Sequence, residues 1–211
     1  MDVVEVIMCV YSRPHRLGII RKQLEEQTSK CFSFTIRDNT KDNQGAAARF
    51  AAAKKTKGNP IIFIDDDQSM RKDFVEYMVG QYDQDCVKGF YSRIFDKEGY
   101  WDSVYCPEAG TEVDYVGTGG MVLDRRIFDE EPSLLAIPPK FFRVEDLFLC
   151  YLARKRGLRL YSTEKHIACI EDGKNQLRNL RAYKETAFAE LRRMGWPLLK
   201  DKSPLTKDRT I

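Results

Sequence analysis

Three consecutive carboxylates, Asp65-Asp66-Asp67, are the feature of this sequence best suited to chemistry. They follow the apolar run 60–64 (PIIFI), whose short length and β-branched residues are typical of a strand buried on both faces. Adjacent carboxylates repel one another, and a hard divalent cation bound through oxygen would relieve that repulsion. A solvated turn is the alternative, but turns favour Asp singly rather than three in a row. The sequence therefore predicts a metal site at the end of this strand.

Three further motifs could serve the same chemistry, although each also has a structural explanation. Gly117-Thr118-Gly119-Gly120 could let the backbone approach a ligand closely, or could form a tight turn. Glu145-Asp146 begins a predicted helix, where acids are favoured by the helix dipole but could also supply a general base. His166 is one of only two histidines, and an imidazole can join carboxylates on a transition metal.

The elements that must position these motifs begin as strand, helix, strand, helix, strand, helix, which predicts a parallel sheet with right-handed crossovers. The first three strands end in polar residues, at Ser12-Arg13, Asp38-Asn39 and Asp65–Asp67. A parallel sheet would bring these ends to one rim, where a nucleotide-sized site could form. The expected elements are strands at 3–10, 32–36 and 60–64, and helices near 17–24, at 44–57 with Asn43 as its N-cap, and near 74–82.

After residue 85 the pattern changes. Strands are expected at 87–95, 100–105, 121–123 and 158–162, and helices at 145–156, ended by Gly157, and at 174–194. We expect one catalytic domain over residues 1–197, with a nucleotide-binding half to about residue 85 and an acceptor half from residue 86. Residues 198–211 are expected to be a polar tail or a linker to further domains of a longer chain.

The composition describes a soluble globular protein, with 43% hydrophobic and 32% charged residues among 211. A net charge of +3 is too small to indicate a nucleic-acid partner. The six cysteines lack zinc-site spacing and fit a reducing compartment. No signal-like segment or membrane-length apolar run is present in the sequence. Together these features predict a cytoplasmic protein without a membrane span.

Taken in order, the motifs resemble those of the GT-A glycosyltransferases, particularly the large inverting family 2, over roughly residues 3–170. Two departures are that Asp38-Asn39-Thr40 replaces the commoner Asp-Asp/Asn-Gly/Ser run, and that Cys9 stands where a small polar residue is frequent. The chain is also similar to the N-terminal glycosyltransferase domain of multidomain chlorella-virus glycosylation proteins, which implies a viral protein in the host cytoplasm. The matching segments are 6–13, Asp38, 45–49 with Arg49, the DXD motif Asp65–Asp67, 117–120, Glu145-Asp146 and His166.

The resemblance implies an α/β GT-A fold, in which helices flank a central, mostly parallel twisted sheet and a smaller antiparallel portion lies on the acceptor side. It implies transfer of a hexose or deoxyhexose, with inversion, from a UDP-sugar such as UDP-glucose or a UDP-deoxyhexose. The acceptor would be a hydroxyl group of a glycan or glycoprotein. The cofactor implied is Mn²⁺ or Mg²⁺.

The resemblance also implies roles for individual residues. Asp146 would be the general base, with Glu145 as the less favoured choice. Asp65, Asp67 and His166 would hold the metal, although Asp65 could instead hold the ribose hydroxyls. Asp38 would accept a hydrogen bond from uracil N3–H, and Arg49 and Tyr11 would flank the ring. The residues expected to contact the nucleotide sugar are Val10, Tyr11, Arg13, Asp38, Arg49, Asp65, Asp66, Gly119 and Gly120.

Two other functions compete with this interpretation. Asp65-x-Asp67-x-Ser69 is close to the DxDx[T/V] loop of haloacid-dehalogenase-type phosphohydrolases, in which Asp65 would be a covalent nucleophile. That loop normally follows the first strand, and Ser69 replaces the required Thr or Val. The other alternative is a non-catalytic module that binds nucleotide sugars or glycans, against which the intact Glu145-Asp146 pair argues.

Overall fold

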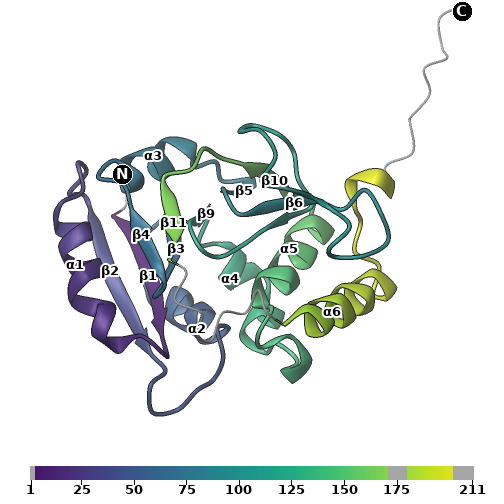
Figure 1. The fold of residues 1–211 in the computed structure, drawn as a ribbon, viewed down its shortest axis with the longest axis horizontal. Helices are drawn as coiled ribbons and strands as arrows, with labels where there is room; N and C mark the ends of the chain where they lie inside the picture. Colours follow the sequence, from purple (N-terminus) through teal and green to yellow (C-terminus); the bar gives the residue numbers. More distant parts are fainter. Residues whose placement is uncertain (1–2, 171–179, 202–211) are drawn as a thin grey trace, which may run out of the picture.

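The computed structural model describes residues 3–170 and 180–201 and has an α/β architecture. In these ranges the central sheet has six strands in the order β10-β5-β9-β3-β1-β2 (Figure 1). The β1–β2, β1–β3 and β5–β10 pairs are parallel, whereas β9 runs antiparallel to both of its neighbours. The strands of this sheet are β1 (Val4–Val10), β2 (Phe32–Asp38), β3 (Ile61–Asp65), β5 (Cys86–Gly89), β9 (Met121–Leu123) and β10 (Arg159–Ser162).

The predicted rim of polar strand ends is confirmed by the strand register. Cys9 of β1 lies opposite Asp65 of β3, and Val10 of β1 lies opposite Asp38 of β2. Because the three strands are parallel, the loops that follow them leave the sheet at the same edge. The Asp65–Asp67 run thus begins at the centre of the molecule, next to the loop after β1.

Helices cover both faces of the sheet, as the continuous apolar strands predict. Alternate residues of β3 enter two separate hydrophobic clusters: Phe63 packs with Phe50 of α2, while Ile62 and Ile64 belong with Phe74 of α3. Figure 1 shows α1 and α6 at opposite ends of the molecule. The helices are α1 (Leu17–Glu25), α2 (Ala48–Lys55), α3 (Phe74–Gln81), α4 (Ile127–Glu130), α5 (Glu145–Lys155) and α6 (Arg181–Arg193), with the 3-10 turns η1 (Pro14–Arg16), η2 (Pro132–Leu135), η3 (Pro139–Phe141) and η5 (Leu199–Asp201).

Two small antiparallel sheets complete the second half of the chain. One has the order β7-β6-β8 and the other pairs β11 with β4. The predicted strands 87–95 and 100–105 are therefore only partly correct: the first is interrupted where the chain leaves the central sheet, and the second is reduced to its last two residues. The strands of the small sheets are β4 (Gln68–Met70), β6 (Ser92–Ile94), β7 (Val104–Tyr105), β8 (Tyr115–Val116) and β11 (Ile167–Cys169).

Two predicted helix starts differ from the structure. Asn43 does not cap α2, because its Oδ1 accepts a hydrogen bond from Gly45 N–H in a turn, and the helix begins only at Ala48. The helix expected from residue 174 is α6, which begins at Arg181; residues 171–179 lie outside the described residues. None of the helices in the described ranges is long and apolar enough to cross a membrane.

Residues 198–201, the first part of the segment 198–211 that was predicted to be a polar tail or linker, pack onto the domain; residues 202–211 lie outside the described residues. Leu198 is buried, and Leu199 N–H donates a hydrogen bond of 2.6 Å to Asp114, whose carboxylate is fully buried. Asp201 forms an ion pair with Arg192 of α6. A buried carboxylate needs hydrogen-bond donors, and Leu199 is one of the two backbone amides that supply them to Asp114, the other being Phe95. This contact binds the chain after α6 to the strands and loops of residues 95–114.

Candidate active site

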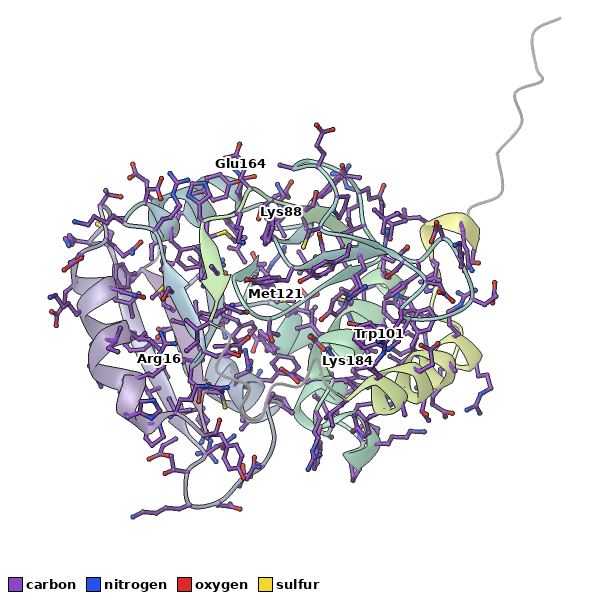
Figure 2. All side chains as sticks on the ribbon, viewed as in Figure 1. Arg16, Lys88, Trp101, Met121, Glu164 and Lys184 are labelled. Atoms are coloured by element: carbon purple, nitrogen blue, oxygen red, sulfur yellow. The ribbon has the colours of Figure 1, made fainter. Side chains whose placement is uncertain are left out.

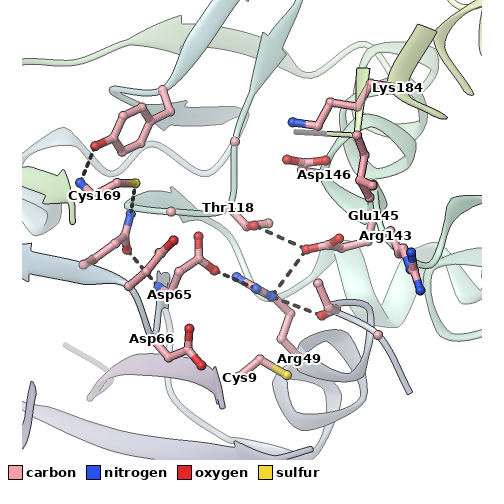
Figure 3. A pocket seen from close by; sticks show the side chains of 18 of the residues that line it. Cys9, Arg49, Asp65, Asp66, Thr118, Arg143, Glu145, Asp146, Cys169 and Lys184 are labelled. Atoms are coloured by element: carbon pink, nitrogen blue, oxygen red, sulfur yellow. Dashed lines mark hydrogen bonds and ion pairs between the residues drawn. The ribbon is translucent and has the colours of Figure 1, made fainter. Parts of the chain in front are cut away.

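A cavity of about 790 Å³ opens at the rim where β1, β2 and β3 end (Figure 3). This volume lies within the usual range for ligand sites. Its walls come from both halves of the chain, with strand-end loops on one side and α5, α6 and the β6–β7 region on the other. The predicted site residues that line it are Tyr11, Arg13, Arg49, Asp65, Asp66, Asp67, Gly119, Glu145 and Asp146.

Arg49 joins the end of β3 to the start of α5. Its Nη2 lies 2.7 Å from Asp65 Oδ1, and its Nε lies 3.5 Å from Glu145 Oε1. Burial opposes the charge of this guanidinium, but the two carboxylates outweigh burial and raise the pKa of Arg49. The sequence predicted Arg49 beside a nucleotide base, whereas the structure pairs it with two carboxylates from opposite walls of the cavity.

Asp66 ties together the loops that follow β1 and β3. Its carboxylate accepts a hydrogen bond of 3.1 Å from Tyr11 N–H and one of 3.3 Å from Arg13 Nη1. Asp66 and Arg13 are both nearly buried. These contacts explain why polar residues follow both strands: they fix the rim at which a ligand would bind.

Asp67 differs from its two neighbours because its carboxylate has no hydrogen-bond or ion-pair partner in any other residue of 3–170 and 180–201, although it lines the cavity. Burial, together with repulsion from Asp65 and Asp66, raises the pKa of Asp67 to about 6, and Arg13 opposes this rise. A cation beside this group would therefore be stabilised. In the part of the chain that the structure describes, no three His, Cys, Asp or Glu side chains form a metal site on their own.

The Glu145-Asp146 pair stands at the first turn of α5, on the cavity wall opposite β3. Glu145 is 2% exposed and its Oε1 accepts from Thr118 Oγ1 at 3.3 Å. Burial raises the pKa of Glu145 to about 8, with Arg49 opposing the rise. Asp146 is more exposed and accepts a hydrogen bond from the hydroxyl group of Tyr115. Figure 3 shows the side chain of Lys184 from α6 pointing toward Asp146.

The glycine run 117–120 passes close to the carboxylates. Gly120 has φ +88° and its N–H donates to Phe63 O, so it forms the turn into β9 and does not line the cavity. At Gly119, a Cβ would lie 2.3 Å from Gln68 Nε2 and 2.8 Å from Asp65 Oδ2. The glycine at position 119 is therefore required by close packing against the end of β3.

Gly119→Ala is accordingly expected to lower the free energy of unfolding by about 1–3 kcal/mol, because the clash is with a buried Gln68 that is itself held by Asp65 N–H. Gly80→Ala is the matched control: no atom lies within 4 Å of a Cβ at this position in α3, so the change should raise stability by up to about 1 kcal/mol. Urea unfolding of the three proteins tests this. Equal midpoints for Gly119→Ala and the native chain would contradict the packing argument.

His166 is not brought to the carboxylate run, contrary to the metal role predicted for it. Its Nδ1 lies 3.0 Å from Asp73 Oδ1, and its ring stacks on Tyr77 of α3 at 3.8 Å. The β11–β4 register explains the difference, because it pairs Cys169 with Gln68, beside Asp67, and leaves His166 beyond Met70 at the far end. Cys169 lines the cavity and His166 does not.

Asp38 and Val10 also lie outside the lining of the cavity. Asp38 faces solvent and accepts hydrogen bonds from the backbone and hydroxyl groups of Thr40, which lower the pKa of Asp38. The next residue, Asn39, is buried at the cavity wall and its Nδ2 donates to Gly45 O at 2.8 Å. Side chains alternate at the end of a strand, and here the alternation turns Asn39 inward and Asp38 outward.

Sequence reasoning missed the aromatic and basic wall on the side of the cavity formed by α6 and the β6–β7 region. Its signal was present in the stretch 90–105 (FYSRIFDKEGYWDSVY), which is unusually rich in aromatic residues. The side-chain alternation of the predicted strands did not indicate that these aromatic rings face a ligand site. The residues of this wall that line the cavity include Phe90, Tyr91, Arg93, Tyr100, Trp101, Tyr105 and Lys184.

Comparisons with known proteins identify the family and the fold. The family model described as glycosyl transferase family 2 matches residues 6–144. Among solved structures, residues 1–349 of S. aureus TarS in complex with UDP align with 79% of this chain, with a TM-score of 0.55 and 14% identity. Another structure of S. aureus TarS aligns with 81% of this chain, with a TM-score of 0.53 and 12% identity. The chain spans 59% and 37% of these two structures. No curated protein matches it.

Proposed function

The chain belongs to glycosyl transferase family 2 and has the GT-A fold, and from this premise we propose that it is a UDP-sugar-dependent glycosyltransferase. It would transfer a hexose or deoxyhexose, with inversion, to a hydroxyl group of a glycan or glycoprotein. One observation carries the proposal: the same cavity has Asp67, which no other residue of 3–170 and 180–201 pairs with, on the wall after β3 and Asp146 on the wall formed by α5. Such a cavity can hold a donor diphosphate at one side and an acceptor hydroxyl at the other.

The proposed metal is Mn²⁺ or Mg²⁺, held by Asp67 together with Asp65. The residues fit such an ion, because the Asp67 carboxylate is half-buried and has no partner in another residue of the described ranges, and because burial and its acidic neighbours raise the pKa of Asp67. Small hard cations are commonly bound by one or two carboxylates plus substrate phosphates, so a third protein ligand is not needed. When bound, the ion would neutralise the negative charge that gathers on the leaving diphosphate. His166 contacts Asp73 and is left out of this set.

The proposed nucleotide is UDP, which the complex of TarS with UDP supports. The base would lie against the wall formed by the loops after β1 and β2, near Tyr11, Asn39 and Gly45. Asp38 could contact the base only from the outer edge of this wall, since its side chain faces solvent and is held by Thr40. The aligned residues of the family model include both loops.

Asp146 is the proposed general base. It would take the proton of the acceptor hydroxyl as that oxygen bonds to the sugar C1, while the bond from C1 to the diphosphate oxygen breaks and its electron pair leaves with UDP. A carboxylate has about four acceptor positions, so the hydrogen bond from Tyr115 leaves room for the acceptor hydroxyl. Glu145 suits this role less well, because it is buried between Thr118 and Arg49.

The family match argues against the phosphohydrolase alternative. The ion pair between Arg49 and Asp65 also argues against it, because Asp65 would have to be the nucleophile of that reaction. A binding module without turnover is separated from an enzyme by the Asp146 variant described in the Discussion. The viral origin, the cytoplasmic location and further domains beyond this chain stay predictions from the sequence.

Thermal unfolding tests the donor site directly. At a UDP concentration about 100-fold above Kd, the melting temperature should rise by about 5–10 °C with Mn²⁺ present, from about 2.7 kcal/mol of binding linkage in a chain of this size. The rise should be much smaller with EDTA, and smaller with CDP than with UDP. Equal rises with Mn²⁺ and EDTA would remove the metal from the proposal, and an equal rise with CDP would remove uridine specificity.

A further inference from the structure

The acceptor side of the cavity contains an arginine enclosed by aromatic rings. The guanidinium carbon of Arg93 lies 4.7 Å from the ring centre of Tyr100, 5.2 Å from that of Trp101 and 4.6 Å from that of Tyr105. Arg93 is 9% exposed, and its Nη1 donates to the hydroxyl group of Ser103. No carboxylate among residues 3–170 and 180–201 forms an ion pair with it.

A second cation reaches the same place from α6. Lys184 Nζ lies 5.6 Å from the ring centre of Tyr100 and 5.9 Å from that of Trp101. Figure 2 shows Lys184 next to Trp101. Like Arg93, Lys184 has no carboxylate within ion-pair distance in the described ranges, although Asp146 attracts it from farther away.

The two carboxylates nearest these cations form no ion pair with them in the described ranges. Glu145 is already paired with Arg49, and Asp146 accepts a hydrogen bond from Tyr115 and attracts Lys184 only from beyond ion-pair distance. Burial and the nearby Arg93 lower the pKa of Lys184, which is the response of a cation short of counter-charge. Lys165, which lies over the ring of Phe90 at 5.7 Å, adds a further positive charge to the cavity lining. Leaving cations desolvated without a counter-charge is costly.

We propose that the acceptor site binds a glycan that carries an oxyanion, a carboxylate, sulfate or phosphate group, between Arg93 and Lys184. The exposed part of the aromatic wall would contact the adjoining sugar ring, and the oxyanion would supply the missing counter-charge through charge-assisted hydrogen bonds. This selects an acidic acceptor over a neutral one. The inference rests on the proposed function, because it assumes that this half of the cavity receives the acceptor.

Fluorescence quenching measures the anion preference without knowledge of the glycan. The chain has two tryptophans, and Trp196 is fully buried, so small ionic quenchers report on Trp101 at the cavity. After each quenching constant is divided by that of free N-acetyltryptophanamide, iodide should quench the native chain at least twofold more strongly than caesium at equal ionic strength, because the cations beside Trp101 concentrate anions. Lys184→Gln should reduce quenching by iodide, whereas the matched charge change Lys22→Gln, on the exposed surface of α1, should not. Equal normalised quenching by the two ions would overturn the proposal.

A binding panel then identifies the acceptor group. The full chain loaded with UDP and Mn²⁺ is applied to immobilised glycans in matched neutral, uronate, sulfated and phosphorylated forms. Retention should be confined to acidic forms, and the arm retained identifies the oxyanion. Lys184→Gln and Arg93→Gln should each weaken retention by about 10- to 100-fold, the usual worth of a charged hydrogen bond. Retention of neutral forms, equal retention by the variants, or no retention would overturn the proposal.

The two proposals can fail separately. The UDP-dependent rise in melting temperature is measured on the same samples of native and Lys184→Gln protein. A normal rise without any preference for acidic glycans would remove the acceptor inference alone. Loss of the rise in the native chain would remove the donor site on which the proposed function depends.

Discussion

Replacing Asp146 by Asn is expected to lower the rate of sugar transfer by about 10²- to 10⁴-fold, the usual contribution of a positioned general base. The amide cannot take the proton of the acceptor hydroxyl, whereas its size and its hydrogen bond with Tyr115 can be kept. Donor binding should be nearly unchanged, because the proposed metal and diphosphate lie near Asp67, at the end of β3. The measurement is UDP affinity and transfer rate on the same variant.

Glu145→Gln is the matched comparison for Asp146→Asn, since it makes the same chemical change one residue away. A milder loss of transfer is expected, because Glu145 is buried and its carboxylate is already engaged by Thr118 and Arg49. Full transfer in Asp146→Asn with loss in Glu145→Gln would exchange the two roles. If both variants keep full transfer, Glu145 and Asp146 serve only to begin helix α5. If the native chain binds UDP but transfers no sugar, a binding module is favoured over an enzyme.

Replacing Asp67 by Asn is expected to abolish the difference in UDP affinity between Mn²⁺ and EDTA, and to lower transfer by about 10³-fold. The reason is that the cation on the leaving diphosphate supplies several kcal/mol of charge stabilisation, and Asp67 is the carboxylate left without a protein partner in the described ranges. Loss of the repulsion within the acidic run should leave the folded chain at least as stable as before. Calorimetric titration with UDP, with and without Mn²⁺, measures the effect.

Two variants serve as controls for Asp67→Asn. Asp96→Asn removes one carboxylate from an exposed turn and should change neither metal dependence nor transfer. Asp66→Asn should act through structure instead, because Asp66 holds Tyr11 N–H and Arg13, so its main effect should be a lower melting temperature. If Asp67→Asn keeps the full Mn²⁺ dependence of UDP binding, the ion is held elsewhere.

Arg49 connects the two halves of the proposed reaction centre. It is shared by Asp65 on the donor side and Glu145 on the acceptor side, with the shorter contact, 2.7 Å, to Asp65. If a divalent ion draws Asp65 toward the diphosphate, the same arginine can compensate by approaching Glu145. This geometry gives a physical reason for an arginine in the small-residue helix α2, where the alanines allow close packing against β1.

The strands and the identity of the chemical motifs could be predicted from the sequence because they depend on local patterns. The continuous apolar runs 3–10 and 60–64 predicted β1 and β3, and parallel pairing then required Cys9 to lie near Asp65 at one rim. Gly157 predicted the end of α5, which the structure places at Lys155. The order of the acidic run, the glycine run and Glu145-Asp146 led to a family that the comparisons confirm.

The tertiary structure alone decided which of these residues share a cavity. Alternation at the end of β2 turned Asp38 to solvent and Asn39 inward, and the β11–β4 register removed His166 from the carboxylates. Packing of α6 brought Lys184, which is distant in sequence, beside Trp101 and close enough to Asp146 for electrostatic attraction. Local patterns fix what an element is, but side-chain direction and strand register depend on contacts between elements far apart in the chain, which no local pattern contains.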